Sequence, residues 1–426
     1  MKTFVKLVTL VVLVSIVAAC GGTPTPTVAV PTTPPVVPAT TVPTAAPTEI
    51  PLTAAEQWAK DNGVGPYQPA TLDWAAIEAA AKQEGTVCVY ANSSKFKKLL
   101  DAWAALYPDI KLDCGDTDSI STKMAGEQQG GNVVGDVWFN SDGHILYGEF
   151  VPNQWLWSFV PDGYSNPGVT AEQPFAIERH SVDVIGYNTE VNPNGCPLTN
   201  WWQLTEPALS GKVFMEDPIA DVSTMAKMAT FVQDADMMAK AYQDLYGKDW
   251  TTDPAAQVDQ YGTKPENAGY LFLKKLAQNH PGIEPGGDEV DAAYATLGMD
   301  KTVDPGYGLT GWDSLTAAAD GEIAMGACTN LDPGLGLVKT NYLGIANKAP
   351  HPNAAKLFIK FVLTTKDGMK PWFVFGTYPG NTAIAAPEGM PPLESLVGKA
   401  FFMDPVYDYA NVSTVRDFWA ISLLAP

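Results

Sequence analysis

Short polar and acidic side chains follow three apolar, strand-like runs of this sequence. They are Ser93 and Ser94 after the run 86–90, Ser141 and Asp142 after the run 133–140, and the segment 217–224 after the run 211–215. Ligands of parallel sheets bind beyond the carboxyl ends of the strands, where helix N-termini also offer free N–H groups. Ser, Thr and Asp are good N-caps as well, so one cluster alone indicates only a helix start. Three clusters together favour a binding site for a small solute.

The sequence motifs of common catalytic sites are absent. There is no G-x-S-x-G, no H-E-x-x-H and no P-loop sequence, and the chain has only four histidines. Residues 306–311 match G-x-G-x-x-G, but Pro305 stands where the preceding apolar strand should end, so we interpret this stretch as a loop. The sequence has neither a C-x-x-C pair nor a Cys/His cluster that would indicate a zinc site. The residues therefore favour binding without catalysis, cofactor or metal.

The elements that must position these clusters alternate between strand and helix. An amphipathic helix with Phe96, Leu99 and Trp103 on one face separates the first two predicted strands. This alternation argues for an α/β fold with a parallel sheet. Strands are predicted at 86–90, 109–113, 133–140, 182–187, 211–215, 322–327 and 341–346, and helices at 72–83, from Ser223, within 242–278, at 313–321 and from Pro352.

The acidic composition limits the classes of partner. The 426 residues include 47 Asp and Glu against 26 Lys and Arg. Phosphate binding needs clustered Lys and Arg, so this balance argues against nucleic acid. Solubility is the simpler reason for the acidity. Without its N-terminal segment the chain has about 360 residues, which is enough for two domains.

Four cysteines besides Cys20 fit an oxidising compartment, and four cysteines allow three pairings. Cys88 and Cys114 lie in predicted strands that one helix separates, and adjacent parallel strands would let them meet. We therefore predict a Cys88–Cys114 disulfide and, by remainder, a Cys196–Cys328 disulfide.

Residues 1–19 have the parts of a secretory signal. Lys2 and Lys6 precede the apolar run 7–17, and small residues lead to Cys20. The run is too short to span a bilayer comfortably, since about 20 residues are needed. A cysteine directly after the small residues resembles a bacterial lipobox, which implies cleavage before Cys20 and attachment of diacylglycerol, with acyl chains such as palmitate, to its sulfur. An ordinary signal peptide or an N-terminal membrane helix is the alternative.

The segment 20–51 is interpreted as a lipid anchor followed by a tether. Residues 23–51 consist almost entirely of Thr, Pro, Val and Ala, without an apolar period. Such a composition cannot build a core and favours an extended chain. It would hold the folded part away from the membrane, with no other membrane contact.

An ordered series of motifs runs from about residue 84 to about residue 380. They are the strand and loop 85–91, V-I-G-Y-N-T at 184–189, the segment 201–218 with its W, P, G-K and D-P residues, D-G-E-I-A at 320–324, the helix 349–359 and G-T-Y-P-G-N at 376–381. In this order the chain resembles the bacterial extracellular solute-binding proteins of ABC importers. More narrowly, it resembles the type 2 periplasmic-binding fold of the branch with ferric-iron and polyamine binders.

The resemblance implies two α/β lobes joined by crossing strands, with a ligand cleft between the lobes. Lobe one would comprise 69–182, lobe two 190–340, and residues 345–426 would return to lobe one and add C-terminal helices. Hinge closure would trap the solute and present a closed face to a membrane permease, whose ATPase is also a separate chain. The receptor would be a monomer, anchored in the periplasm or on the cell surface.

One departure from the family bears on the solute. Ferric binders carry a tyrosine pair shortly after the "GE" strand, whereas residues 326–333 here contain no tyrosine, which argues against iron. Asp142, Asp217, Asp221 and Asp332 would favour a cationic organic solute, such as a polyamine or a thiamine-like compound. The predicted lining residues are Ser93, Ser94, Ser141 and Asp142 from lobe one, and Asp217, Ser223, Thr224, Trp312, Thr329 and Asp332 from lobe two.

Two other functions remain as alternatives. A secreted, membrane-tethered α/β hydrolase would fit the same tether, but the missing nucleophile motif and the few histidines count against it. A tethered module that binds protein or polysaccharide is the third. Binding of a small molecule without turnover separates the receptor from the hydrolase.

Overall fold

The computed structural model describes residues 51–117, 119–259 and 262–424. The chain divides into two units, Met1–Pro51 and Leu52–Pro426, and the second is one compact unit. The predicted signal, the lipid-attachment residue Cys20 and nearly all of the predicted tether lie outside the described residues. No helix in the described part is long and apolar enough to cross a membrane.

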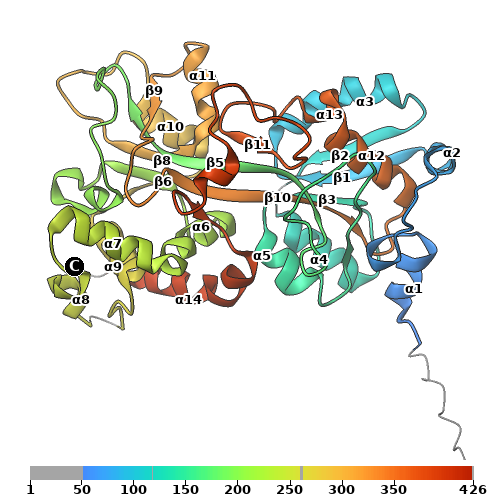
Figure 1. Cartoon of the computed structure of the whole chain (residues 1–426), viewed down its shortest axis with the longest axis horizontal. Helices are drawn as coiled ribbons and strands as arrows, with labels where there is room; N and C mark the ends of the chain where they lie inside the picture. The colour runs from blue at the N-terminus through green and yellow to red at the C-terminus, as the bar shows by residue number, and fades with distance from the viewer. Residues whose placement is uncertain (1–50, 118, 260–261, 425–426) are drawn as a thin grey trace, which may run out of the picture. The chain divides into compact units, whose positions relative to one another are not determined.

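The strands of the second unit join in one sheet network in the order β2-β1-β3-β10-β5-β8-β6-β7 (Figure 1). β1, β2 and β3 are parallel to one another, as are β6, β7 and β8. The strands are β1 Thr86–Ala91, β2 Lys111–Asp116, β3 Val137–Asn140, β4 Leu156–Trp157, β5 Ala176–Asn188, β6 Val213–Glu216, β7 Gly282–Glu284, β8 Tyr307–Gly311, β9 Met325–Ala327, β10 Gly336–Ala346, β11 Thr377–Pro379 and β12 Phe401–Phe402.

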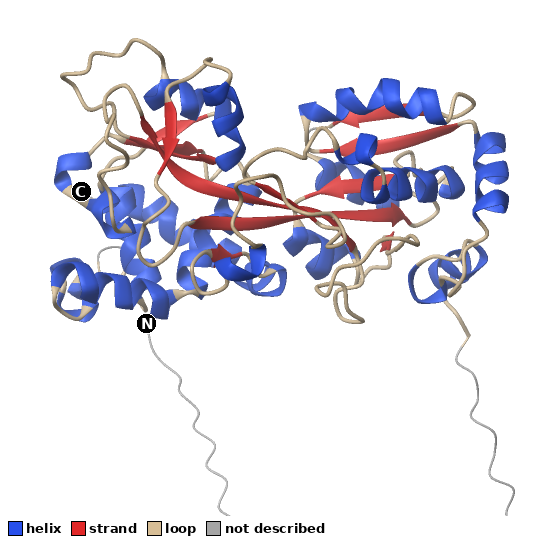
Figure 2. Cartoon of the chain, turned by 45° about the horizontal axis from the view of Figure 1, so that its top comes forward, coloured by secondary structure: helices blue, strands red, loops and turns tan. Residues whose placement is uncertain are grey.

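Helices cover this network and connect its parallel strands (Figure 2). The α-helices are α1 Ala54–Asp61, α2 Trp74–Glu84, α3 Leu100–Leu106, α4 Ile120–Gly130, α5 Gly143–Ile145, α6 Val222–Gln233, α7 Ala235–Tyr246, α8 Pro254–Gln257, α9 Ala268–Gln278, α10 Gly287–Ala295, α11 Leu315–Ala319, α12 Pro352–Thr364, α13 Lys366–Met369 and α14 Pro405–Leu424. The short helical turns used below are η2 Ser94–Leu99, η3 Leu146–Phe150 and η7 Trp312–Ser314.

The hydrophobic side chains form separate cores, which define two lobes. One core combines residues 59–177 with residues 342–372, and we call the part around it lobe one. Two other cores combine residues within 182–338 with parts of the chain from residue 378 onward, and we call the part around them lobe two. Among the strands that the structure describes, only β5 and β10 extend through both lobes, as an antiparallel pair (Figures 1 and 2).

Polar residues occupy both strands at the point where the cores change. On β5 the core passes from Ile177 to Val182 across Glu178–Ser181, and on β10 it passes from Val338 to Tyr342 across Lys339–Asn341. We call these seven residues the polar crossing. Apolar side chains there would fuse the two cores, so their absence allows each lobe to pack as a separate body.

The stretch 306–311 corrects one expectation, because most of it is strand β8 and not a loop. β8 pairs with β5 so that Gly308 lies opposite Gly186. A Cβ atom on either glycine would come within about 2 Å of the Tyr294 side chain. These glycines therefore allow the Tyr294 ring to pack closely against the sheet, which explains them without a dinucleotide-binding role.

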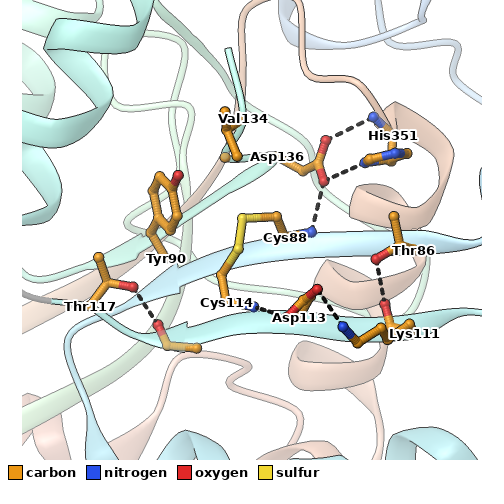
Figure 3. Close-up of a disulfide and its surroundings, with 12 residues drawn as sticks. Thr86, Cys88, Tyr90, Lys111, Asp113, Cys114, Thr117, Val134, Asp136 and His351 are labelled. Carbon is orange, nitrogen blue, oxygen red and sulfur yellow. Dashed lines mark hydrogen bonds and ion pairs between the residues drawn. A yellow bond between two sulfur atoms is a disulfide. The ribbon is translucent and has the colours of Figure 1, made fainter. Parts of the chain in front are cut away.

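Both predicted disulfides are present. Cys88 bonds to Cys114 between the parallel neighbours β1 and β2, and Cys196 bonds to Cys328 in lobe two. Figure 3 shows the first bond beside Asp136, whose buried carboxylate accepts hydrogen bonds from the Cys88 N–H and from the N–H and Nδ1 of His351. Asp136 therefore ties β1 to the start of α12.

The C-terminal helix packs differently from the rest of the predicted return to lobe one. α14 contacts α6 and α9, and its Val415 and Trp419 belong to a lobe-two core. Its first half also contacts α5 and η3, which belong to lobe one (Figure 1). The segment 345–426 thus serves both lobes, because the apolar face of α14 finds its partners on lobe two.

Candidate functional site

Two adjoining polar cavities lie where the lobes meet the polar crossing. Each has a volume of about 390 Å³. They share Asn92, Glu216, Lys227 and Lys339 in their walls, and we call the two cavities together the cleft. Polar side chains dominate this lining, which suits a hydrogen-bonding solute.

The first cavity has walls of opposite charge. The lobe-one wall contains the cations Lys95 and Arg179 without a carboxylate, and the part of the lobe-two wall formed by α10 and η7 contains the carboxylates of Asp288, Asp291 and Asp313 without a cation. The other lobe-one residues are Asn92, Ser93, Ser94, Trp372 and Thr377, and the other lobe-two residues are Gly287, Leu309, Thr310, Gly311 and Ser314. Ser181, Asp183, Glu216, Lys227 and Lys339 complete the lining between the walls.

The second cavity is lined mainly by hydroxyls, amides and carboxylates. Its carboxylates include Asp142 of lobe one and Asp221 of lobe two. Asp142 accepts hydrogen bonds from the Ser121 hydroxyl at 2.6 Å and the Asn140 amide at 2.9 Å, and Asp221 caps α6. The remaining lining residues are Asn92, Thr117, Ser119, Ile120, Ser141, Glu216, Ala220, Val222, Ser223, Lys227 and Lys339.

A buried charge network stands between the two cavities. Lys227 Nζ lies 2.8 Å from Asp183 Oδ2 and 3.4 Å from Glu216 Oε2, while Lys339 Nζ lies 3.7 Å from Asp183 Oδ1. The Lys227 and Asp183 side chains are each 5% exposed. Burial acts to raise the pKa of the Asp183 carboxyl, but the two lysines outweigh it and lower that pKa to about 2. Asp183 is therefore ionised and neutralised from two sides.

A bulge in β5 positions Arg179 on the lobe-one wall. Asn341 of β10 pairs with Arg179, but the next residue, Tyr342, pairs with Ile177, so Glu178 is an extra residue of β5. The guanidinium Nη1 donates to the carboxylate of Glu178, which is 2% exposed. The guanidinium also lies over the Trp372 ring, at 5.3 Å from the ring centroid.

Four carboxylates of the cleft have no cationic partner within the described part of the chain. Asp142, Asp221, Asp288 and Asp291 take part in none of its ion pairs, whereas Asp183, Glu216 and Asp313 each pair with a lysine. Burial raises the pKa of Asp291 despite a hydrogen bond from the Ser314 hydroxyl at 2.7 Å. The cleft therefore has an excess of negative charge.

One ion pair spans the first cavity. Lys95 Nζ, at the start of η2 in lobe one, lies 2.6 Å from Asp313 Oδ2 of η7 in lobe two. Both side chains are about one-third exposed. The pair therefore links the two walls of the cleft.

The fold of this chain matches known binding proteins along almost their whole length. Iron-bound HitA from Pseudomonas aeruginosa aligns with a TM-score of 0.57 at 16% identity, covering 79% of this chain and 99% of HitA. An ABC-transporter substrate-binding protein from Agrobacterium tumefaciens aligns with a TM-score of 0.58 at 12% identity, covering 81% and 97%. AfuA from Actinobacillus pleuropneumoniae, with fructose-6-phosphate bound, aligns with a TM-score of 0.54 at 14% identity, covering 80% and 99%.

The chain has the two-lobed type 2 fold of the periplasmic binding proteins. No protein-family model matches its sequence, and no curated protein matches it. The similar structures include a substrate-binding protein of an ABC transporter and the periplasmic binding protein AfuA. The binding-protein fold predicted from the ordered motifs is therefore confirmed.

Several of the predicted lining residues come together in the cleft of this binding-protein fold. Ser93 and Ser94 line the first cavity, and Ser141, Asp142 and Ser223 line the second. Thr224 lies next to Ser223 on α6, and its hydroxyl donates to Glu216 at 2.9 Å.

Four other predicted lining residues lie elsewhere. Asp217 lines neither cavity, and its carboxylate accepts the Ile219 N–H in a turn. Trp312, Thr329 and Asp332 line another cavity, of about 730 Å³, between lobe two and the C-terminal segment.

Backbone bonds explain the position of Asp332. The Trp201 N–H donates to the Asp332 carbonyl at 3.0 Å, and the Asp332 N–H donates to the Thr199 carbonyl at 2.9 Å. The Cys196–Cys328 bond also holds the start of this segment. Together they fasten the segment to lobe two, where it lines the other cavity and not the cleft.

The sequence interpretation missed the charged residues in and next to the polar crossing, and those of α10. Arg179, Asp183 and Lys339 come from β5 and β10, while Asp288 and Asp291 come from α10. A usable signal for the strands was the polar interruption of two apolar runs, E-R-H-S at 178–181 and K-T-N at 339–341. Nothing local distinguished α10 from a solvated acidic helix.

Within the described ranges, no group of three or more His, Cys, Asp or Glu side chains is arranged to hold a metal ion.

Proposed function

We propose that this chain is a lipid-anchored substrate-binding receptor of an ABC import system. It binds a small organic solute that carries positive charge, by hinge closure of the two lobes, and delivers the solute to a membrane permease. The solute leaves chemically unchanged. The observation that carries this proposal is a cleft between two lobes in which four carboxylates take part in no ion pair of the described residues.

The negative charge of the cleft, and not the ligands of similar structures, supports a cationic solute. Those structures include proteins with bound iron, agropinic acid, glucopine and fructose-6-phosphate, so the fold alone selects no ligand class. Among the described residues, seven carboxylates line the two cavities against four cationic side chains. An ammonium group would neutralise part of this excess, and a sugar phosphate would increase it.

Iron receives less support from the cleft. No tyrosine is among the described residues that line the two cavities. Ser, Thr and Asn side chains, which are abundant there, suit hydrogen bonds to an organic molecule.

The polar crossing supports closure by a hinge. β5 and β10 connect the two lobes, and both walls of the cleft come together across these strands. A solute that contacts both walls would favour the closed state by the difference between its affinities for the closed and open states.

A thermal-shift screen of the purified protein, stripped of bound solute, tests the proposal. The panel holds polyamines, thiamine, basic amino acids, sugars, sugar phosphates and ferric iron. We expect a rise in Tm with cationic organic compounds, because ligand binding to the native state stabilises it by mass action. If Tm rises only with sugar phosphates or iron, the proposed positive charge of the solute is wrong. If the protein converts a bound compound into a product, the proposed receptor function is wrong.

The anchor has a separate test. Mass spectrometry of the mature N-terminus should find diacylglycerol on Cys20, and a Cys20→Ser variant should leave the membrane fraction. A mature N-terminus other than Cys20 would contradict the anchor and leave the binding proposal intact.

A further inference from the structure

We infer that the lobe-one wall of the first cavity is a carboxylate-binding subsite built from Arg179 and Ser93, so that the solute is a zwitterion with its cationic group toward lobe two. This inference rests on the proposed function, because it concerns the same cleft. It adds a second charged group to the solute and assigns each wall one end of the molecule.

Arg179 has unused donors on the cavity side. Its only hydrogen bond within the described structure runs from Nη1 to Glu178, which leaves Nε and Nη2 without a protein acceptor. The side chain is 12% exposed and lines the first cavity. Nε and Nη2 present two parallel N–H donors, and that fork matches the two oxygens of a carboxylate.

Ser93 adds a hydroxyl donor to the same wall. Its Oγ accepts the indole N–H of Trp372 at 3.1 Å, and Trp372 is the ring over which the Arg179 guanidinium lies. Because the Ser93 oxygen already accepts a bond, its own O–H is free to donate into the cavity. Arg179, Trp372 and Ser93 thus form one supported group whose free atoms are donors.

The opposite wall requires the opposite charge. Asp288 and Asp291 on α10 face the same cavity of about 390 Å³ and have no ion-pair partner in the described part of the chain. A solute with an anion alone would leave them uncompensated, and a solute with a cation alone would leave the Arg179 donors unused. A molecule with both groups satisfies both walls.

The overall charge of the cleft selects a carboxylate over a phosphate. Among the described lining residues, one guanidinium with free donors serves the anion, while seven carboxylates line the cleft. A phosphate dianion would bring twice the repulsion of a carboxylate for one bidentate contact.

Matched pairs of probes that differ in one carboxylate test the inference. Isothermal titration of the purified protein would compare L-lysine with cadaverine and L-arginine with agmatine. We expect the carboxylated member of each pair to bind at least about ten-fold more tightly, as a charge-assisted bidentate contact implies. β-Alanine should likewise bind more tightly than phosphoethanolamine.

Variants assign this preference to the subsite. Arg179→Lys keeps a cation beside Glu178 but removes the fork, so the ratio of affinities within each pair should fall several-fold. Ser93→Ala should lower the ratio less, and it disturbs no buried charge. Asp288→Asn removes a charge from the opposite wall, so it should weaken the binding of both members of a pair equally. The ratio of their affinities should then stay unchanged, whereas a general loss of cleft structure would also abolish the preference for the carboxylated member.

Three results would overturn the inference in distinguishable ways. Cadaverine binding as tightly as lysine would remove the carboxylate subsite and leave the cationic receptor standing. Tighter binding of phosphoethanolamine than of β-alanine would replace the carboxylate with phosphate. Absence of binding by every cationic probe, carboxylated or not, would reject the cationic solute and this inference together.

Discussion

Lys227 is the central cation of the buried charge network in the cleft. It neutralises Asp183 from a position that is 5% exposed, and removal of one partner from a buried ion pair leaves an uncompensated charge. We expect Lys227→Met to lower the free energy of unfolding by about 3–5 kcal/mol in urea titrations.

A second substitution separates charge from packing at this site. The double variant Lys227→Met/Asp183→Asn should be more stable to unfolding than Lys227→Met alone, because it no longer contains the buried Asp183 carboxylate. Lys240→Met, which removes an exposed pair with Asp244, should produce no measurable change. Equal losses in the single and double variants would show that the charge network does not determine the stability here.

Asp408, in the first turns of α14, should make the free energy of unfolding depend on pH. Neither carboxylate oxygen has a hydrogen-bond partner in the described structure, and it shares a small cavity with the buried, unpaired ring of His144. Burial and the nearby Asp404 raise the pKa of Asp408 to about 8. The native state therefore keeps a proton that the unfolded chain loses above about pH 4.

The contribution of Asp408 to the free energy of unfolding should accordingly fall as pH rises from about 4 to about 8. The fall is at most about 1.4 kcal/mol for each pH unit. Asp408→Asn should then stabilise the protein more at pH 8 than at pH 5 in urea unfolding. Asp417→Asn, an exposed change on the same helix, is the control. The assignment fails if the Asp408→Asn effect is the same at both pH values.

At the scale of elements, the two disulfides close chain segments of very different length. Cys88 and Cys114 are 26 residues apart and join adjacent strands, whereas Cys196 and Cys328 are 132 residues apart. In the loop-entropy description, the longer loop gives the larger stabilisation, by about 1.4 kcal/mol.

We therefore expect Cys196→Ala/Cys328→Ala to lower stability more than Cys88→Ala/Cys114→Ala. Denaturant unfolding of the two double variants measures the difference, and non-reducing peptide mapping of the unaltered protein checks the pairing. A larger loss from the Cys88/Cys114 variant would mean that local strand packing around Asp136 outweighs loop entropy.

For the whole molecule, the Lys95–Asp313 pair predicts a bias between open and closed arrangements of the lobes. The pair joins the two walls but is about one-third exposed on each side, which limits it to about 0.2–1 kcal/mol. Lys95→Ala should thus reduce the closed fraction of the solute-free protein by at most about five-fold.

A double-mutant cycle with Asp313→Ala isolates this contribution, read from the distance between fluorophores on the two lobes. The coupling should shrink at high salt, because exposed pairs are screened. Effects of the two single variants that add fully in the double variant would show that the pair does not couple the lobes.

The sequence by itself determined the local elements and their order. The run 86–90 became β1 Thr86–Ala91, the helix from Pro352 became α12, and the cysteine positions indicated both disulfides. Apolar periodicity, helix ends and neighbouring parallel strands are properties of short segments, so short segments suffice to predict them. The ordered motifs then led to the fold class.

Only the tertiary structure decided which side chains face the cleft. Arg179 and Lys339 look like interruptions of apolar strands until β5 and β10 pair and place them between two cores. Asp332 resembles a cleft residue until its bonds to residues 199 and 201 turn it toward another cavity. The direction of a side chain at a lobe boundary depends on contacts between residues more than a hundred positions apart, and no local pattern contains that information.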